Sequence, residues 1–203
     1  MTKSISTMGR KEGSTREAFQ SYYESNHAIL GAKHFPFTKY VRNHLIDHAD
    51  LWYDTISEFW ADDIEAAANL MNGPVGEILR EDENKFCSQQ AIGPAFSEEH
   101  VFSQGSPTDK DGIRAAALIA RDGVSEEDFK TTLLRVARSA AVHQTGVSVD
   151  LCTSWRDIKF PADAVLWTPE VYRAPLPKGL KLNMNLRVRR IETPAEKLSI
   201  NQR

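Results

Sequence analysis

The chain has 203 residues, of which 41% are hydrophobic and 26% are charged, and its formal net charge at pH 7 is −3. This composition is ordinary for a globular protein and excludes a disordered chain. The longest apolar run, residues 115–120, is too short to cross a bilayer, and residues 1–16 lack the apolar core of a signal peptide. Cys87 and Cys152 have no metal or redox spacing, so we expect reduced thiols in a cytoplasmic protein.

The first half of the chain predicts strands and helices in the order βαββαβ. Hydrophobic periodicity, hydroxyl or acidic caps and Gly or Pro breakers set the expected boundaries. The first helix begins after Ser14 or Thr15, and Gly31 and Pro36 are expected to end it. Strands are expected at 5–8, 38–46, 55–60 and 97–102. A second helix is expected between a cap at Asp62 or Asp63 and its end at Gly73-Pro74, followed by a helical stretch at 77–86.

The second half begins after a linker at 103–111 that is rich in Gly, Ser, Pro and charged residues. A strand at 115–120 and a helix at 126–142 lead to strands at 147–152, 164–167 and 182–189. Prolines at 169, 175 and 177 predict that a loop shortens or replaces the second helix of this half. The tail after residue 191 is expected to be a strap or a disordered end.

One nine-residue pattern occurs twice, 110 residues apart. Residues 11–19 (KEGSTREAF) and 121–129 (RDGVSEEDF) share a basic, an acidic, a glycine, a hydroxyl, a glutamate and a phenylalanine position. A turn glycine, an N-cap hydroxyl, a first-turn carboxylate and a first core aromatic residue are typical of a helix start. The repeat therefore indicates two related units within one chain.

These elements predict an α+β fold in which two fused ferredoxin-like (βαββαβ) units form an α+β barrel. The expected domains are a first unit at 1–104 that carries the site, a degenerate second unit at 113–191 and a tail at 192–203. The first half is net acidic and the second is net basic, so the halves could dock on each other within one chain or across a dimer.

His27 is the first candidate for catalysis. It is expected at the end of the first helix beside Asn26, where the negative end of the helix dipole favours a charged imidazole and suits acid/base chemistry. A capping or core role is the alternative. The equivalent position of the second unit, Ala137, lacks an imidazole, which favours a functional role for His27 and a single active pocket.

Tyr40, Arg42 and His44 form the second candidate cluster, because alternation along a strand puts all three on one face. If that face lines a cavity, a phenol, a guanidinium and an imidazole converge on a small molecule, and Asn43 faces the helices. If the face meets water, the three residues are ordinary surface groups. Trp60 is expected as a cavity wall, and His100 either enters the same cavity or lies on the surface.

Other chemistries find little support in the sequence. His44 and His48 are spaced like zinc ligands on a helix, but they lie on a strand and a loop, so no metal site is expected. Neither cysteine has a paired base nearby in sequence. The motifs of serine hydrolases, phosphate-binding loops and dinucleotide-binding folds do not occur, nor does a nucleic-acid recognition motif.

The first half resembles the EthD family of the dimeric α+β barrel superfamily. The resemblance runs through these segments in the order typical of the family: residues 10–13 (RKEG), 16–19 (REAF), 22–23 (YY), 27–28 (HA), 40–44 (YVRNH), 53–60 (YDTISEFW) and 82–86 (DENKF). It implies a ferredoxin-like sheet that pairs with a second sheet to enclose a pocket. In lactone isomerase relatives a helix-end histidine and a strand tyrosine line this pocket, and His27 and Tyr40 match them.

Together these observations predict a cofactor-free enzyme that performs His-mediated acid/base chemistry. The expected reaction is that of a dehydratase, decarboxylase, isomerase or cyclase acting on an aromatic or polyketide-like oxygenated substrate. The expected catalytic residues are His27, Tyr40 and His44, and the expected substrate-binding residues are Asn26, Arg42, Asn43, Trp60 and His100.

Two alternatives remain open at this point. One is an oxidoreductase, either a cofactor-independent monooxygenase or a heme binder that uses His27, His44 or His100. The other is a non-catalytic ligand-binding protein. In each case the expected partner is a small hydrophobic oxygenated molecule and not nucleic acid or a membrane, and the chain is expected to be a monomeric pseudo-dimer or a homodimer.

Overall fold

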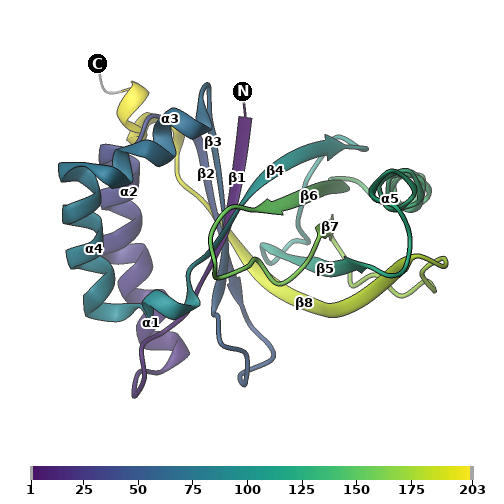
Figure 1. Ribbon diagram of the computed structural model, residues 1–203, viewed down its shortest axis with the longest axis horizontal. Coiled ribbons are helices and arrows are strands. Elements are labelled where there is room, and N and C mark those ends of the chain that lie inside the picture. The colour runs from purple at the N-terminus through teal and green to yellow at the C-terminus, as the bar shows by residue number, and fades with distance from the viewer. Residues whose placement is uncertain (1, 202–203) are drawn as a thin grey trace.

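A closed antiparallel barrel of eight strands forms the centre of the computed structural model (Figure 1), which describes residues 2–201. The strands, in chain order, are β1 (Thr2–Met8), β2 (Phe37–Leu45), β3 (Thr55–Ala61), β4 (Gly93–Val101), β5 (Ile113–Arg121), β6 (Ser148–Ser154), β7 (Ala164–Thr168) and β8 (Leu180–Glu192).

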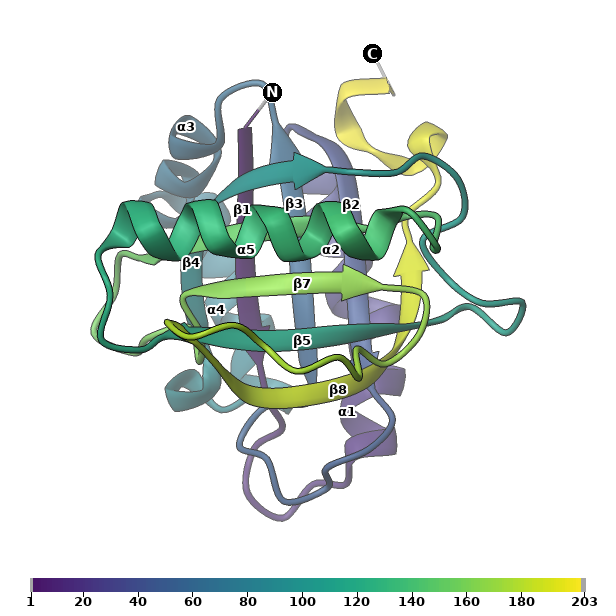
Figure 2. The ribbon, with the colours of Figure 1, turned by 90° about the vertical axis from the view of Figure 1, so that its right-hand side faces the viewer.

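The strand order around the barrel is β1-β3-β2-β8-β5-β7-β6-β4. Each half of the chain thus contributes four adjacent strands, ordered fourth, first, third, second, as in a ferredoxin-like sheet. The two four-stranded sheets run across each other (Figure 2) and are joined at two seams, β2–β8 and β4–β6. The predicted α+β class and barrel are confirmed, while the division into two fused ferredoxin-like units remains our interpretation.

Helices cover the outer faces of the two sheets unequally (Figure 1). Four α-helices and short helical turns lie over the first sheet, whereas α5 (Glu126–Ala141) is the α-helix that covers the second. The elements on the first side are α1 (Arg16–Tyr22), η1 (Tyr23–His27), α2 (Ala28–His34), α3 (Ile64–Asn69), η2 (Leu70–Asn72), α4 (Pro74–Phe86), η3 (Gln89–Ala91), η4 (Ala195–Lys197) and η5 (Ser199–Asn201). None of the helices within residues 2–201 combines the length and apolar character that a bilayer span requires.

The repeated nine-residue pattern folds in the same way in both halves. Gly13 and Gly123 have φ angles of 78° and 67°, a left-handed conformation that favours glycine. The hydroxyls of Thr15 and Ser125 cap α1 and α5 by accepting backbone N–H groups at 3.1 Å. The phenylalanine four residues after each cap is buried. The predicted helix starts are therefore confirmed.

The first helix ends before Pro36, as predicted, but Gly31 does not end it. It continues through Gly31 to His34 and ends where Phe35, the residue before Pro36, turns to an extended conformation. Gly31 does not break the helix because it lies over the ring of Tyr40, where a Cβ atom would stand 3.5 Å from Tyr40 Cε1. Gly31 thus packs α2 against β2 at a distance that an added Cβ atom would also fit.

Two irregular segments complete the second half. Within the described residues no helix lies between β7 and β8, as the prolines predicted, and the connecting loop packs Tyr172 and Leu176 against the core under α5. After β8 the tail returns over the first half as a strap. Leu198 is buried there, and Ser199 Oγ donates a hydrogen bond to the Phe35 carbonyl oxygen at 2.7 Å.

The barrel interior is filled by apolar side chains and an ionic cluster. Lys3 Nζ lies 2.8 Å from a Glu58 oxygen and 2.7 Å from an Asp150 oxygen. Arg114 pairs with Glu58 and stacks over Trp167, 3.7 Å from the ring centroid. These side chains therefore fill the space between the two sheets around Lys3 and Arg114, where the resemblance implied a pocket.

Candidate functional site

A small pocket lies between the helices and the outer face of the first sheet, with a volume of about 170 Å³. Strands β1, β2 and β3 form its floor, and α2, α3 and α4 form its sides. Most of the lining is apolar or aromatic, and His27 and Tyr40 are both part of it. We call it the His27 pocket. Its apolar wall includes Met8, Phe35, Phe37, Phe59, Ile64, Met71 and Leu79.

His27 is held by a carboxylate. Its Nδ1 lies 3.0 Å from Asp82 Oδ2, and Asp82 Oδ1 accepts a hydrogen bond from the Tyr22 hydroxyl at 2.8 Å. The hydrogen bond from His27 lowers the pKa of Asp82 against the effect of burial, and Tyr22 adds to the lowering. An ionised Asp82 requires the proton on Nδ1, so Nε2 of the neutral imidazole is the basic nitrogen. Nε2 has no hydrogen-bond partner within residues 2–201.

A π-helical turn, η1, places this histidine. Tyr23 and His27 both lie on the buried face of η1, with ring centroids 5.1 Å apart. Such turns are rare and often mark functional sites. The prediction that His27 ends the helix is wrong, because seven more helical residues follow it. The helix dipole consequently does not act on the imidazole, and Asp82 supplies the negative partner.

Tyr40 reaches the same pocket from β2. Its hydroxyl lies 2.9 Å from the Tyr23 hydroxyl, which lies 2.9 Å from Ser57 Oγ. Burial raises the pKa of Tyr40 well above its usual range and that of Tyr23 to about 12. Both phenols therefore keep their protons near neutral pH. Tyr40 can donate a hydrogen bond, while Tyr23 and Ser57 support its oxygen.

The other residues of the predicted strand cluster lie behind this pocket and do not line it. His44 Nε2 is 2.7 Å from Glu24 Oε1, and Arg42 Nη2 is 2.6 Å from Glu24 Oε2. Tyr40, Arg42 and His44 share a face, as predicted, but helices cover it. Asn26 was expected beside His27 in the site, yet it is exposed and bonds to its own helix.

Asn43, Trp60 and His100 also lie away from the His27 pocket. Asn43 points into the barrel, where it donates to Glu58 at 2.9 Å, so its predicted place against the helices is wrong. Trp60 Nε1 donates to Glu99 Oε2 at 2.9 Å at one end of the barrel. His100 lies on the far edge, with Nε2 2.9 Å from Glu98. These residues cannot contact a ligand bound beside His27.

Three residues of this site, Asp82, Trp155 and Arg156, were not predicted from the sequence. Asp82 lay in a segment that carried the family resemblance, but nothing in its spacing indicated a partner 55 positions away. Trp155 and Arg156, from the loop after β6, line the His27 pocket as well. The second half of the chain thus lines the pocket together with the first half, which carries the predicted site residues.

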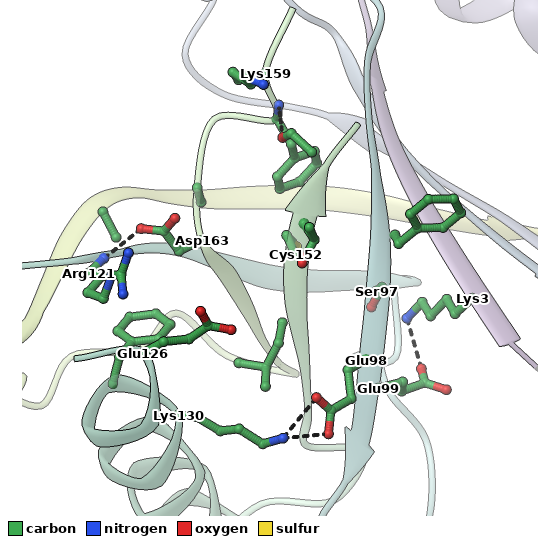
Figure 3. Close-up of a pocket in the computed structure, with 18 of the residues that line it drawn as sticks. Lys3, Ser97, Glu98, Glu99, Arg121, Glu126, Lys130, Cys152, Lys159 and Asp163 are labelled. Carbon is green, nitrogen blue, oxygen red and sulfur yellow. Dashed lines mark hydrogen bonds and ion pairs between the residues drawn. The ribbon is translucent and has the colours of Figure 1, made fainter. Parts of the chain in front are cut away.

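A larger cavity of about 1260 Å³ opens at one end of the barrel beside α5 (Figure 3). Its walls carry ion pairs: Lys130 binds Glu98 at 2.8 Å, and Lys3 binds Glu99 at 2.8 Å. No histidine is among its lining residues, and burial raises the pKa of the Cys152 thiol well above its usual range. This cavity therefore has neither an imidazole base nor an activated thiol. Within residues 2–201 no three His, Cys, Asp or Glu side chains gather as metal ligands.

Comparisons with known proteins agree with this architecture. Residues 11–90 match the family model of the EthD domain, which confirms the resemblance for that segment. The sequence matches no curated protein. A protein from Lactobacillus acidophilus NCFM, provisionally described as a monooxygenase, is similar in structure, with a TM-score of 0.55, 13% identity and coverage of 93% of each chain.

Two further solved structures are similar. A provisionally assigned chlorite dismutase has a TM-score of 0.53, 11% identity and coverage of 94% of each chain. An EthD family protein from Bacillus halodurans C-125 is 19% identical over 49% of this chain and 100% of its own, with a TM-score of 0.40. At such low identity the two matches that span the whole chain establish a shared fold and not a shared activity.

Proposed function

Because residues 11–90 form an EthD domain, we propose that this chain is a cofactor-free enzyme that performs proton-transfer chemistry on a small oxygenated substrate. The observation that carries the proposal is the Asp82–His27 pair on the wall of an apolar pocket that Tyr40 also lines. One chain closes the barrel and supplies every wall of this pocket. We therefore propose that a single chain holds a complete site.

In this mechanism the base is Nε2 of His27. It removes a proton from an acidic C–H or O–H group of the substrate, and ionised Asp82 stabilises the resulting imidazolium. Tyr40 donates a hydrogen bond to the substrate oxygen on which negative charge develops. The imidazolium then returns the proton to a different atom. Isomerisation is complete at this point. In dehydration the proton goes to the leaving hydroxyl, which departs as water, and in decarboxylation it goes to the carbon that has lost CO₂. In cyclisation the carbanion attacks a carbonyl carbon and the new alkoxide takes the proton. A positioned acid/base group contributes roughly 10²–10⁴-fold to rate.

Exchange of substrate protons with solvent tests the proposal without a known product. Wild-type protein is incubated in D₂O with a panel of small aromatic hydroxyketones, and deuterium incorporation is followed by NMR. We expect His27→Ala to lower the exchange rate by about 10²-fold or more with an unchanged circular dichroism spectrum. Exchange in the variant at the wild-type rate would refute the role of His27.

A monooxygenase is the second candidate. The similarity in fold to a protein described as a monooxygenase over 93% of the chain favours it. Removal of a proton by His27 would again be the first step, since a carbanion or phenolate reacts with O₂ more readily than its neutral parent. Consumption of O₂ by wild-type protein with a phenolic substrate, and its loss in His27→Ala, would select this reaction over a lyase or isomerase.

The geometry favours the remaining alternatives less. Sites for drug-sized ligands have volumes of about 300–1,000 Å³, and a heme belongs to that size class. The His27 pocket, at about 170 Å³, is smaller, while the larger cavity offers no histidine. A non-catalytic carrier would bind ligand equally well with His27→Ala and would show no proton exchange in either form.

A further inference from the structure

The mouth of the His27 pocket is built partly by the second half of the chain. Trp155 and Arg156 follow directly after β6 and lie on the pocket wall. The Trp155 ring stacks on Phe96 of β4 with centroids 5.8 Å apart. The Arg156 guanidinium lies 5.1 Å from the centroid of the Trp155 ring. The indole thus forms an apolar rim with a cation beside it.

The charges on the pocket wall are unequal. Arg80 and Arg156 contribute two guanidinium groups, and Glu83 is the carboxylate among the lining residues. Glu83 already accepts a hydrogen bond from Gln89 Nε2 at 3.1 Å. Arg80 donates to the Met71 carbonyl oxygen at 2.6 Å, and within residues 2–201 neither guanidinium pairs with a carboxylate. The lining therefore carries two guanidinium groups against one carboxylate, and ionised Asp82 contacts His27 without lining the pocket.

We propose that the pocket binds a small aromatic or alicyclic carboxylate, with Arg156 and Arg80 holding the carboxylate at the mouth. The planar guanidinium donates two parallel N–H bonds that match the two oxygens of a carboxylate. The carboxylate on the lining, Glu83, favours a monoanion over a phosphate dianion. The volume of about 170 Å³ accommodates a single ring with short substituents, whose far end reaches His27. This inference rests on the proposed function for its substrate, but binding alone tests it.

The experiment compares benzoate with benzamide, a neutral molecule of nearly the same shape. Each is titrated into the full chain, and binding is followed by NMR or calorimetry at low salt. We expect benzoate to bind wild type at least about tenfold more tightly than benzamide, since a charge-assisted bidentate bond is stronger than a neutral one. Arg156→Gln should reduce this preference by about fivefold or more and leave benzamide binding unchanged.

Controls separate the possible causes of the preference. Arg138→Gln changes an exposed position of α5 outside the pocket, so this variant should retain the wild-type preference for benzoate over benzamide. His27→Ala should also retain the preference for benzoate over benzamide. Loss of the proposed catalysis and loss of carboxylate binding are therefore distinguishable. Three results would overturn the inference: no saturable benzoate binding at millimolar concentration, equal effects of the Arg156 and Arg138 substitutions, or tighter binding of phenylphosphonate than of benzoate.

Discussion

The contact between Asp82 and His27 decides what the imidazole can do. Without the carboxylate, neither the proton on Nδ1 nor the orientation of the ring is determined. We expect Asp82→Asn to lower kcat by about 10²-fold, because the amide favours the wrong tautomer and leaves the imidazolium without a counter-ion.

Tyr22→Phe is the matched control for this prediction. It removes the hydrogen bond to Asp82 Oδ1 and keeps the carboxylate, so the loss of kcat should stay below about tenfold. A similar loss of kcat in both variants would show that Asp82 acts only through packing.

Glu24 makes the stability of the helix–sheet contact depend on pH. Burial alone would raise the pKa of Glu24. Hydrogen bonds from His44 and Arg42 outweigh burial and lower this pKa from 4.5 to about 2. A lowered folded-state pKa stabilises the protein fully above about pH 4.5, and this contribution is lost as the pH falls towards about 2. Glu24→Gln should therefore lower the free energy of unfolding at pH 7 by about 1–2 kcal/mol, allowing for partial solvent screening.

Urea denaturation at pH 7 and pH 3 measures this effect. The difference between wild type and Glu24→Gln should shrink at the lower pH, because Glu24 is then protonated in the unfolded chain while it stays largely ionised in the folded protein. Glu81→Gln, at an exposed position of α4, should show no such dependence. A pH-independent gap between wild type and Glu24→Gln would contradict the assignment.

At the scale of elements, the packing of α2 on β2 sets the size of the His27 pocket. A Cβ atom at Gly31 would lie 3.5 Å from Tyr40 Cε1 and 3.9 Å from the Tyr40 hydroxyl, which are ordinary contacts. Gly31→Ala should raise the free energy of unfolding by about 0.5–1 kcal/mol, because alanine favours the helix. The added methyl group also occupies part of the pocket, so KM should rise or kcat should fall.

Gly76 in α4 provides the contrast. A Cβ atom there would lie 1.9 Å from the Met71 carbonyl oxygen, so Gly76→Ala requires the backbone to move and should destabilise the protein. Thermal unfolding of the two variants would show opposite shifts in Tm. A lower Tm for Gly31→Ala would show that the close packing of α2 does not tolerate a methyl group.

The sequence predicted the elements well where local signals are strong. The caps at Thr15 and Ser125 and the proline-rich loop before β8 depend on neighbouring residues, so they could be read from the chain. Local signals failed at Gly31, because its tertiary contact with Tyr40 outweighs its low helix propensity. Alternation also grouped Tyr40, Arg42 and His44 correctly, but it cannot tell which face of a strand the helices cover.

At the scale of the whole molecule, the ionic cluster inside the barrel joins the two halves. Burial alone would lower the pKa of Lys3. The nearby carboxylates of Asp150, Glu58 and Glu99 outweigh burial and raise this pKa, so the ammonium group of Lys3 is charged. Lys3→Met would leave buried carboxylates without their cation. Breaking a buried ion pair in this way costs about 3–5 kcal/mol, which we expect as the loss in the free energy of unfolding measured in urea.

Lys39→Met is the matched control. Lys39 Nζ stacks over Trp60 at 4.4 Å, as Lys3 does at 4.3 Å, but Lys39 forms no ion pair with a carboxylate of the described residues. Its replacement should cost less than about 1 kcal/mol. Equal losses in the two variants would attribute the effect of Lys3 to its stacking on Trp60.

The location of the site was harder to predict than the barrel. Resemblance implied the barrel and matched His27 and Tyr40, and both line one pocket. The pocket lies under the helices and not between the sheets, since ionic and apolar side chains fill the barrel interior. Asp82 and Arg156 come from positions far from His27 in the chain, and no local pattern reveals such contacts.

The seam between β2 and β8 has a consequence for how this protein is made. Strand β2 emerges early from the ribosome, but its outer neighbour is the last strand of the chain. Until residues 180–192 are synthesised, the nascent first half exposes an unpaired strand edge that can join the edge of another unfinished chain. The speed of translation, and the binding of chaperones to this edge until residues 180–192 are made, should therefore determine the yield of correctly folded molecules.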